Sequence, residues 1–570
     1  MSIVQINKKG KKVSSKYHSV IGIDLGTTYS AVSAFNKHSK TAEIIKNHVE
    51  WDSETTPSVI SLDPLMRKVI VGFSAKRQIE NPNIRPEDTI IEIKREMGAF
   101  FKDEGHLEKF NAKSAGKRIH DPVEVFFAGR WNRPQEISAF ILMKMKEIAE
   151  KEIGEEIRDA VVTVPTYFTE PQRKATEEAA LLAGMYPRQI IPAPTAAAIC
   201  YGLDRMESEK KNYLIYDLGG GTCDVTVFGV EGNNIDVEAT SGDPRLGGVD
   251  FDDRLTQWVV KQIQEKKPGY TVDAASLARI KAGAEKAKIT LSIYKETTLD
   301  LLFLQIPELP FISITRDIFE NVIKDLLEHS LNIVDEAMNI STNDRGVSRD
   351  MIDAIILVGG SGKIPKVRSM LINYFDKDES FIKEANPATV VARGAAILAY
   401  KFKPSPPPFN IKQRSQEGLT NPDADDVVGV QGLITEHSLG VGLADNTVVN
   451  IINRGQSIPT IKKIGTICNA APTERILVHV YQGEGKYTFD NELIGTLQII
   501  NLDPTKGPGQ YKFEITFQLD VNGLLTMTVL NLNENRTYEG TFEQRTGAGG
   551  DDQLIIMREK LLELYAGSAV

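Results

Sequence analysis

The chain has 570 residues, a formal net charge of −10 and a pI near 5.6. Its 41% hydrophobic and 25% charged residues are ordinary for a globular protein, and its length allows several domains. The acidic balance argues against nucleic acid as the main partner. The most apolar runs are of strand length, so the sequence predicts no transmembrane helix and no membrane partner.

Two features bear on the compartment. Residues 1–18 hold five lysines and no acidic residue, but they lack the apolar core of a secretory signal. We expect a disordered basic tail, with targeting or an anionic-surface role as the alternative. The cysteines Cys200, Cys223 and Cys468 form no CxxC pair, which fits a reducing compartment without a disulfide or zinc framework. The expected location is therefore cytoplasmic.

Residues 19–402 alternate between apolar, β-branched runs and helical patterns. Strands are expected at 159–165, 212–219 and 353–360, and a helix with a glycine stop over 134–154. Alternation of strands and helices predicts an α/β class.

Two segments in this region share one design. "IDLGTTYSAVSAF" begins at Ile23 and "IYDLGGGTCDVTVF" at Ile215; each has an apolar strand, Asp, Gly, hydroxyls and a second strand. Each predicts a hairpin whose glycine tip lets backbone amides surround a phosphate. An isolated match is usually an ordinary glycine turn. Two matched loops, with a third glycine turn in "LVGGSGKIP" from Leu357, favour a phosphate site.

The carboxylates at the strand ends imply a cation. Asp24 and Asp217 would repel a phosphate unless a positive ion stood between them, which predicts Mg²⁺ held partly through water. Two facing loops would hold a polyphosphate from both sides. Such an arrangement needs two related lobes, which an internal repeat supplies.

The pattern changes after residue 402. Four prolines between Pro404 and Pro408 cannot continue a helix or a central strand, so residues 403–433 are expected to form an interdomain linker. Two-residue alternation then begins, with Asn522-Gly523 between two alternating runs. It predicts an antiparallel β domain over 434–545. Residues 546–570 predict one short helix that starts at acidic Asp551 and stops at a glycine.

Several longer motifs point to one family. "GIDLGTTYSAV", "VVTVPTYFTEPQRKAT", "DLGGGTCDVTVF" and "LVGGSGKIPKVR" closely resemble the heat-shock seventy (DnaK-type) chaperone family. "HSLGVGL", "VHVYQGE" and "FEITFQLDVNGLLTM" resemble its peptide-binding domain. The resemblance covers about residues 20–545. It implies an α/β, two-lobed, actin-like ATPase domain that binds nucleotide, then an antiparallel β-sandwich that binds substrate, with 546–570 as a lid remnant.

The resemblance implies ATP or ADP with Mg²⁺ as cofactors, and K⁺ as a further candidate. It gives Asp24 and Asp217 to the metal, and Lys94, Asp217, Asp224 and Thr222 to catalysis, with Lys94 beside the γ-phosphate and the attacking water. Lys94 by itself would be a helix-surface lysine, and Glu285, Lys288 and Ser292 would be one solvated helix face. The implied nucleotide-binding residues are Asp24, Gly26, Thr27, Thr28, Tyr29, Gly219, Gly220, Gly221, Thr222, Gly247, Gly248, Glu285, Lys288, Ser292, Gly359, Gly360 and Ser361.

The resemblance also implies peptide binding and partners. Pro165 and Arg173 match the interlobe switch of the family. Partners would be unfolded or extended polypeptide, a J-domain co-chaperone and a nucleotide-exchange factor. The alternative for the apolar peptide-site positions is that they are only sandwich core. The matching positions are Val441, Leu443, Ile476, Val478 and Phe513, with Ala444 and Asn469 forming an arch.

The chain departs from the family pattern around the nucleotide. Ala193 replaces a glutamate near the γ-phosphate, and Ile289 and Lys363 replace two adenine-facing arginines. Val249 and Ala388 replace two acidic residues. These changes predict weaker nucleotide binding and slower hydrolysis.

Three functions therefore stay open. The first is an ATP-dependent chaperone that binds apolar peptide segments. The second is a degenerate member that hydrolyses poorly and acts as a co-chaperone or exchange factor. A small-molecule kinase of the same superfamily is a remote third. In the linker, Val427, Val428 and Val430 are the candidates for a strand that docks on the nucleotide domain.

Overall fold

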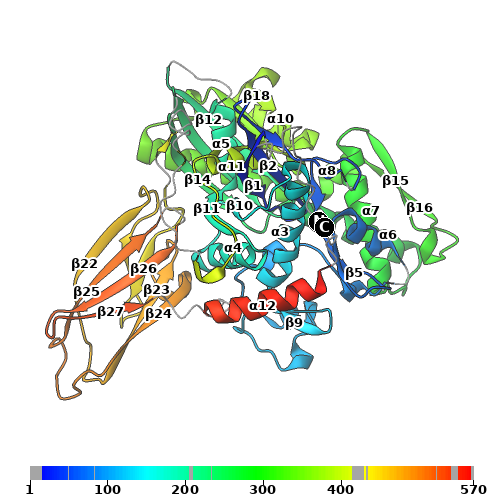
Figure 1. The fold of residues 1–570 in the computed structure, drawn as a ribbon. Helices are drawn as coiled ribbons and strands as arrows, with labels where there is room; N and C mark the ends of the chain where they lie inside the picture. Colours follow the sequence, from blue (N-terminus) through cyan, green and yellow to red (C-terminus); the bar gives the residue numbers. More distant parts are fainter. Residues whose placement is uncertain are drawn as a thin grey trace, which may run out of the picture.

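The structure is a computed structural model that describes residues 16–48, 50–81, 84–203, 209–232, 234–384, 386–413, 421, 429–431, 434–520, 523–540 and 550–565. It shows a two-lobed α/β body and a separate β-sandwich, so the expected fold class is confirmed (Figure 1). Residues 1–15 of the predicted basic tail lie outside the described residues, and the first strand begins at Tyr17.

The first lobe, here lobe I, is built on one sheet. Its strand order is β11-β10-β1-β2-β3. The central strand β1 pairs antiparallel with β2 and parallel with β10, and β10 pairs parallel with β11. The strands are β1 (Tyr17–Asp24), β2 (Tyr29–Asn36), β3 (Thr41–Ile44), β10 (Asp159–Val164) and β11 (Tyr186–Pro192).

The second lobe, lobe II, repeats this pattern. Its order is β18-β17-β12-β13-β14-β19, with β12 antiparallel to β13 and parallel to β17. The internal repeat predicted from two loops therefore extends to whole sheets. The strands are β12 (Lys211–Leu218), β13 (Cys223–Glu231), β14 (Asn234–Asp243), β17 (Ala354–Val358), β18 (Ile382–Glu384) and β19 (Gly429–Gln431).

Helices cover both sheets. The helix expected over 134–154 is confirmed as α3 (Pro134–Ile153), which ends at Gly154 with φ 75°. The other principal helices are α4 (Glu170–Leu182), α6 (Gly248–Lys266), α7 (Ala274–Leu291), α9 (Lys324–Ile340) and α10 (Pro365–Phe375). Smaller elements are β4 (Thr56–Pro57), β5 (Ile60–Leu62), β6 (Val69–Val71), α1 (Phe73–Lys76), β7 (Thr89–Ile90), α2 (Glu104–Lys109), β8 (Val125–Phe127), β9 (Arg130–Asn132), β15 (Glu296–Asp300), β16 (Phe311–Thr315) and α8 (Arg316–Val322).

Two equivalent helices join the lobes. α5 (Ala193–Leu203) follows β11, and α11 (Val390–Ala399) follows β18. Their small residues allow a close crossing: a Cβ added at Gly394 would lie 1.7 Å from the Ala196 carbonyl oxygen. On the other side of α11, a Cβ at Gly22 would lie 2.1 Å from the Ala396 nitrogen. The lobes are therefore held together by backbone contacts that leave no room for side chains.

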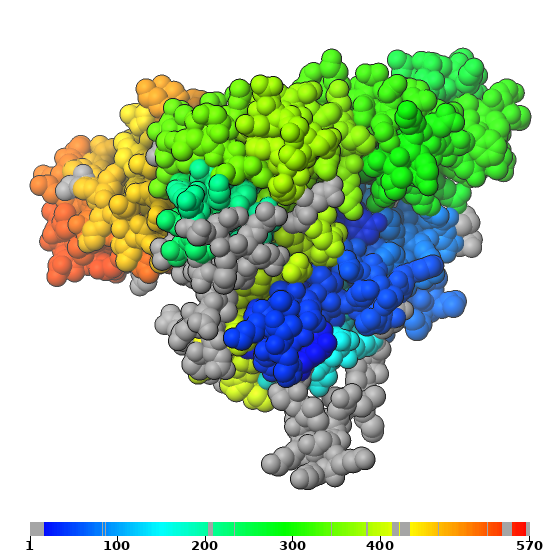
Figure 2. All heavy atoms as spheres, turned by 90° about the horizontal axis from the view of Figure 1, so that it is seen from above, coloured from blue at the N-terminus to red at the C-terminus, as the bar shows by residue number. Residues whose placement is uncertain are grey.

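The β domain is a sandwich, as expected. Its sheets have the orders β21-β20-β23-β24 and β22-β25-β26-β27. The predicted hairpin is confirmed, since β25 and β26 pair antiparallel from Leu519 and Leu525, and Gly523 adopts φ 74°. The strands are β20 (Leu439–Gly442), β21 (Val448–Ile452), β22 (Thr460–Cys468), β23 (Arg475–Gln482), β24 (Glu492–Ile500), β25 (Lys512–Leu519), β26 (Leu525–Asn531) and β27 (Arg536–Gly540). The sandwich forms a protrusion at one end of the molecule, against lobe II (Figure 2).

Part of the expected linker is bound to the body. The Ser405 amide and hydroxyl donate to the Asp159 carboxylate at 2.7 and 2.6 Å, and Ile411 is buried in the lobe I core. Further along, β19 adds a parallel strand to lobe II and aligns Val430 with Ile235. The docking-strand prediction is thus confirmed for Val430, while Val427 and Val428 lie outside the described residues.

The C-terminal helix packs on lobe I. α12 (Asp551–Leu564) buries Leu554 and Leu561 in the lobe I core, and the Tyr565 hydroxyl donates to Glu147 at 3.0 Å. The helix ends before Gly567, the glycine expected to stop it. In Figure 1, α12 lies beside α4 and away from the sandwich strands. Over the described stretches of chain, no helix has both the length and the apolar character to cross a membrane.

The crossing of α5 and α11 can be tested by a glycine substitution. Helix propensity alone predicts that Gly394→Ala stabilises the protein by about 1 kcal/mol. We expect instead a loss of about 3 kcal/mol, because the new methyl meets the backbone of α5. Thermal unfolding of the apo protein measures it. Gly105→Ala in α2 is the control, since its added Cβ meets only Asp103 Oδ1 at 3.4 Å. Equal effects of the two substitutions would contradict the account.

Candidate functional site

The two glycine loops meet tip to tip between the lobes. One joins β1 to β2 and the other joins β12 to β13, so both predicted hairpins are confirmed. A Cβ at Gly220 would lie 2.1 Å from the Thr28 hydroxyl, and one at Gly221 would lie 2.5 Å from the Thr27 hydroxyl. Larger residues here would push the lobes apart. Glycine is therefore needed for contact between the loops as well as for any phosphate.

Hydrogen bonds from neighbouring residues hold each loop in place. The Gly26 amide donates to the Ser30 hydroxyl at 3.2 Å, and the Ser58 hydroxyl donates to the Gly26 carbonyl at 2.8 Å. The Gly219 carbonyl accepts bonds from the Ser361 hydroxyl at 2.9 Å and from the Gly248 amide at 3.0 Å. The glycine turn at 359–361 and the start of α6 thus hold the second loop, as their expected place in the site requires.

Three carboxylates, the buried Asp217 and Asp224 and the partly buried Asp24, gather around one buried lysine. Lys94 is only 8% exposed, so it is not the surface lysine that its local sequence suggests. Burial raises the pKa of Asp24, and burial with repulsion from Asp224 and Asp24 raises the pKa of Asp217 far above its usual range. Burial raises the pKa of Asp224 to about 6. Burial lowers the pKa of Lys94 despite these three carboxylates.

This group of charges fits a cation. The raised pKa values mean that ionising all three carboxylates against one ammonium is unfavourable, and a divalent cation would stabilise their ionised forms. In the part of the chain that the structure describes, no group of three or more His, Cys, Asp or Glu side chains is placed to hold a metal directly. Mg²⁺ would therefore bind through water and phosphate oxygens, with Asp24 and Asp217 behind the water.

Lys94 is positioned by a short 3-10 segment, Ile93–Glu96, with a buried anchor. The Glu96 carboxylate is bound by His106 at 3.0 Å and Lys109 at 2.8 Å. Burial opposes its ionisation, but these two partners outweigh burial and lower the pKa of Glu96 to about 2. The next residue, Arg95, binds Asp250 and donates to the Gly221 carbonyl at 2.9 Å. The segment thus ties lobe I to the second loop.

Two residues that the resemblance places around the nucleoside, Lys288 and Glu285, form contacts between separate helices and lobes. Lys288 donates to the Gly248 carbonyl at 2.8 Å and pairs with Asp252 at 2.7 Å. Glu285 pairs with Lys76 of lobe I at 2.7 Å, so α7 is more than a solvated helix face. Ile289, at a position where the family has an arginine, exposes half of its side chain.

Ala193 lies at the start of α5, directly after β11, and is buried. β11 aligns Pro192 with Val164, beside the segment that leads to Thr166. The methyl group of Ala193 offers no hydrogen-bond acceptor there. Compared with the glutamate of the family pattern, Ala193 therefore lacks one carboxylate.

A chain of contacts leads from this group to the sandwich. Asp224 accepts a bond from the Thr166 amide at 2.9 Å, and the Thr166 carbonyl accepts one from Arg173 at 3.3 Å. Arg173 is buried and pairs with Glu436, at the entrance to the sandwich, at 3.0 Å. Pro165, directly before Thr166, is also buried. The two switch residues thus lie on a continuous path between the domains.

Other interdomain contacts were not foreseen. Arg454 of the sandwich donates to the Tyr167 hydroxyl and to the Thr240 carbonyl. The Glu170 amide donates to Gln482 at 3.2 Å. These pairs are far apart in sequence, and no local pattern links them. Like the Arg95–Asp250 pair, they had no detectable signal in a single sequence.

The peptide-site positions fall into two layers. Val441 and Phe513 are buried in the sandwich core, whereas Leu443, Ile476 and Val478 are half-buried beside it. Ala444 is exposed, as an arch residue would be. Asn469 differs from the expectation, because its side chain is buried and bound to backbone atoms of residues 471, 507 and 511. It shapes a loop and is not free to bridge a peptide.

Comparison with known proteins agrees with this geometry. The family model described as Hsp70 protein matches residues 20–562. The chain belongs to the Hsp70 family. It is 36% identical to a heat shock protein of the SSB type from Pyricularia oryzae, over 93% of this chain and 83% of that protein. It is 35% identical to "Heat shock 70 kDa protein" of Neurospora crassa over 92% of this chain and 78% of that protein. Members of this family are chaperones and ATPases.

The anchor of Lys94 predicts a pH-dependent stability. A carboxylate whose pKa is lowered in the folded state stabilises the fold at pH values above its unfolded-state pKa of 4.5. This stabilisation is lost as the pH falls toward 2. We expect Glu96→Gln to lower the free energy of unfolding by about 3 kcal/mol at pH 7 and by much less near pH 2.5. Chemical denaturation at both pH values measures this. A difference that does not depend on pH would contradict it.

Proposed function

We propose that this protein is an ATP-dependent chaperone whose nucleotide controls the affinity of the sandwich for apolar peptide segments. The observation that carries the proposal is the contact path from Asp224 through Thr166 and Arg173 to Glu436. It gives the phosphate site a direct mechanical connection to the peptide domain. A small-molecule kinase would have no use for that connection.

The residues of the site have distinct tasks. Amides of the two loops and the hydroxyls of Thr27 and Thr28 would bind the phosphates of ATP. Mg²⁺, when bound, neutralises phosphate charge, and Asp24 and Asp217 would orient its water ligands. Lys94 would lie beside the γ-phosphate, where its buried ammonium stabilises the charge of the transferred group. The Asp224 carboxylate, which the Thr166 amide holds in place, would orient the attacking water.

The proposed coupling between ATP binding and peptide binding is a case of thermodynamic linkage. ATP joins the lobes across the two loops and so fixes the position of Thr166 relative to Asp224. Arg173 then holds Glu436, and β19 completes the sheet of lobe II. If the docked sandwich binds peptide less tightly than the free one, ATP weakens peptide binding by the same free energy. Loss of the γ-phosphate would release the dock.

A slow, degenerate hydrolase is the second candidate. The buried methyl of Ala193, in place of a carboxylate, supports it. In that case the protein would bind nucleotide and act mainly as a co-chaperone or exchange factor. We also propose a J-domain partner and a cytoplasmic location. The location is supported by Cys200, Cys223 and Cys468, which form no disulfide within the described part of the chain.

Single-turnover hydrolysis of ATP tests the catalytic assignment. Lys94→Ala should lower the rate by about 100-fold, because charge stabilisation at the transferred phosphate is lost. Lys261→Ala, which removes a lysine on the exposed face of α6, should leave the rate unchanged. Ala193→Glu should raise the rate by about tenfold by restoring an acceptor. A fast wild-type rate that Ala193→Glu does not change would contradict the role given to this position.

The coupling path can be tested by energy transfer between dyes on Cys468, the exposed native cysteine, and on a second cysteine made by Glu308→Cys in lobe II. ATP should change the transfer in the parent protein, and Arg173→Ala should abolish the change. Lys174→Ala, in the same helix, is the control. Glu436→Ala should add little to Arg173→Ala, since both remove one ion pair. Full additivity would contradict the path.

A further inference from the structure

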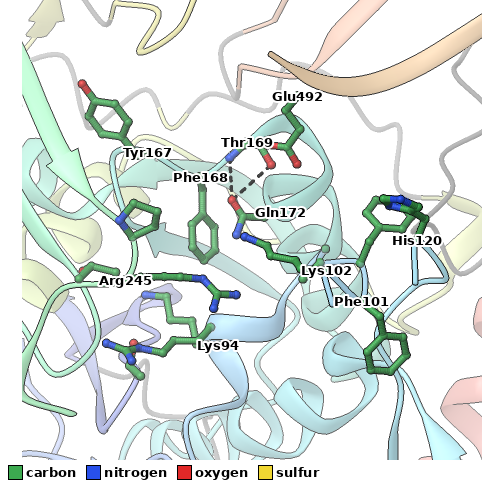
Figure 3. Close-up of a pocket in the computed structure, with 17 residues that line it drawn as sticks. Lys94, Phe101, Lys102, His120, Tyr167, Phe168, Thr169, Gln172, Arg245 and Glu492 are labelled. Atoms are coloured by element: carbon green, nitrogen blue, oxygen red, sulfur yellow. Dashed lines mark hydrogen bonds between the residues drawn. The ribbon is translucent and has the colours of Figure 1, made fainter. Parts of the chain in front are cut away.

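A cavity of about 330 Å³ opens beside Lys94 on the side away from the nucleoside residues. Thr27, Lys94 and Thr222 form its inner end, and none of Glu285, Lys288 or Ser292 lines it. The loop at residues 167–169 and Gln172 form one wall. Its outer part is formed by Lys102, Arg245 and Glu492, the last from β24 of the sandwich (Figure 3). The cavity therefore runs from the γ-phosphate position to the domain interface.

The charged side chains that line this cavity are mostly cationic. It contains Lys94, Arg95, Lys102 and Arg245, and Glu492 is its one acidic residue. Arg95 is neutralised by Asp250. Among the described residues, neither the Lys102 ammonium nor the Arg245 guanidinium forms a salt bridge, although the Arg245 backbone amide donates to the Asp243 carboxylate at 2.7 Å. Two cationic side chains outside any salt bridge thus lie on the route out of the phosphate site, where an anion would be attracted.

Glu492 places the sandwich at the mouth of this route. Figure 3 shows it entering from the sandwich strand above the loop at 167–169. Glu492 is exposed at the mouth of the cavity, and the positive charge of Lys102 favours its ionised carboxylate. When the sandwich is docked, a carboxylate stands at the exit and competes for Lys102. When the sandwich leaves, the mouth widens and that negative charge is removed.

We propose that this cavity is the exit path of inorganic phosphate, with Lys102 and Arg245 as a second anion site and Glu492 as a gate that the docked sandwich closes. The inference depends on the proposed ATP hydrolysis. After cleavage, ADP would still fill the nucleoside side of the site. Inorganic phosphate would therefore need to leave by a different route. Release from the second site breaks and forms no covalent bond. It would couple loss of phosphate to undocking of the sandwich.

Comparing cleavage with release tests the path in the full chain. Acid quench measures cleavage of ATP in a single turnover, and a fluorescent phosphate sensor measures release. Lys102→Ala and Arg245→Ala should slow release by about tenfold with cleavage unchanged. Glu492→Gln should speed release by a similar factor. Lys113→Ala and Glu474→Gln, which lie outside the cavity, are the controls. Release rates that follow cleavage in every variant would overturn the inference.

A second measurement does not need hydrolysis. Equilibrium dialysis of radiolabelled inorganic phosphate against the ADP-loaded protein measures the anion site directly. Lys102→Ala and Arg245→Ala should weaken phosphate binding by about tenfold, Glu492→Gln should strengthen it, and the controls should not change it. If ATP is not cleaved but this pattern holds, the proposed function fails and the anion site stands. If the variants bind phosphate like the parent protein, the anion site is wrong.

Discussion

The close contact of two glycine loops, with three largely buried carboxylates behind them, is the constraint on which the rest of the structure depends. Gly220 and Gly221 lie so near Thr28 and Thr27 that neither lobe can move at this point without opening the phosphate site. The buried negative charge makes this closed arrangement unfavourable unless cations and phosphate balance it. In the proposed function, nucleotide would therefore control the angle between the lobes, and the close crossing of α5 and α11 would act as the pivot.

The position of the sandwich follows from the same constraint. Arg173 pairs with Glu436 and donates to the carbonyl of Thr166, whose amide is bound by Asp224 of the other lobe. β19, Arg454 and Gln482 then add contacts that depend on both lobes being in place. These bonds are polar and partly exposed, as suits an interface that must separate again. The firmly buried attachments, at Ser405 and α12, are on lobe I alone.

Much of the fold could be predicted because its signals are local. The strand–Asp–glycine pattern identified both loops, the period of two identified an antiparallel β domain, and the prolines marked a boundary. That this domain is a sandwich came from the family resemblance. The burial of Lys94 could not be predicted, since it depends on segments distant in sequence. The backbone bonds of Asn469 could not be predicted for the same reason, since they come from residues up to 42 positions away in sequence. The prolines also gave no sign that residues 403–413 pack on lobe I.

The central claim is that nucleotide in the cleft and peptide in the sandwich are energetically linked. The most direct measurement is the dissociation rate of a fluorescent apolar peptide from the full chain, with ATP and with ADP. The account predicts faster dissociation with ATP, by about tenfold or more, because a coupling of about 1–3 kcal/mol is typical for linked sites. Equal rates with ATP and ADP, at concentrations shown to saturate the nucleotide site, would contradict it.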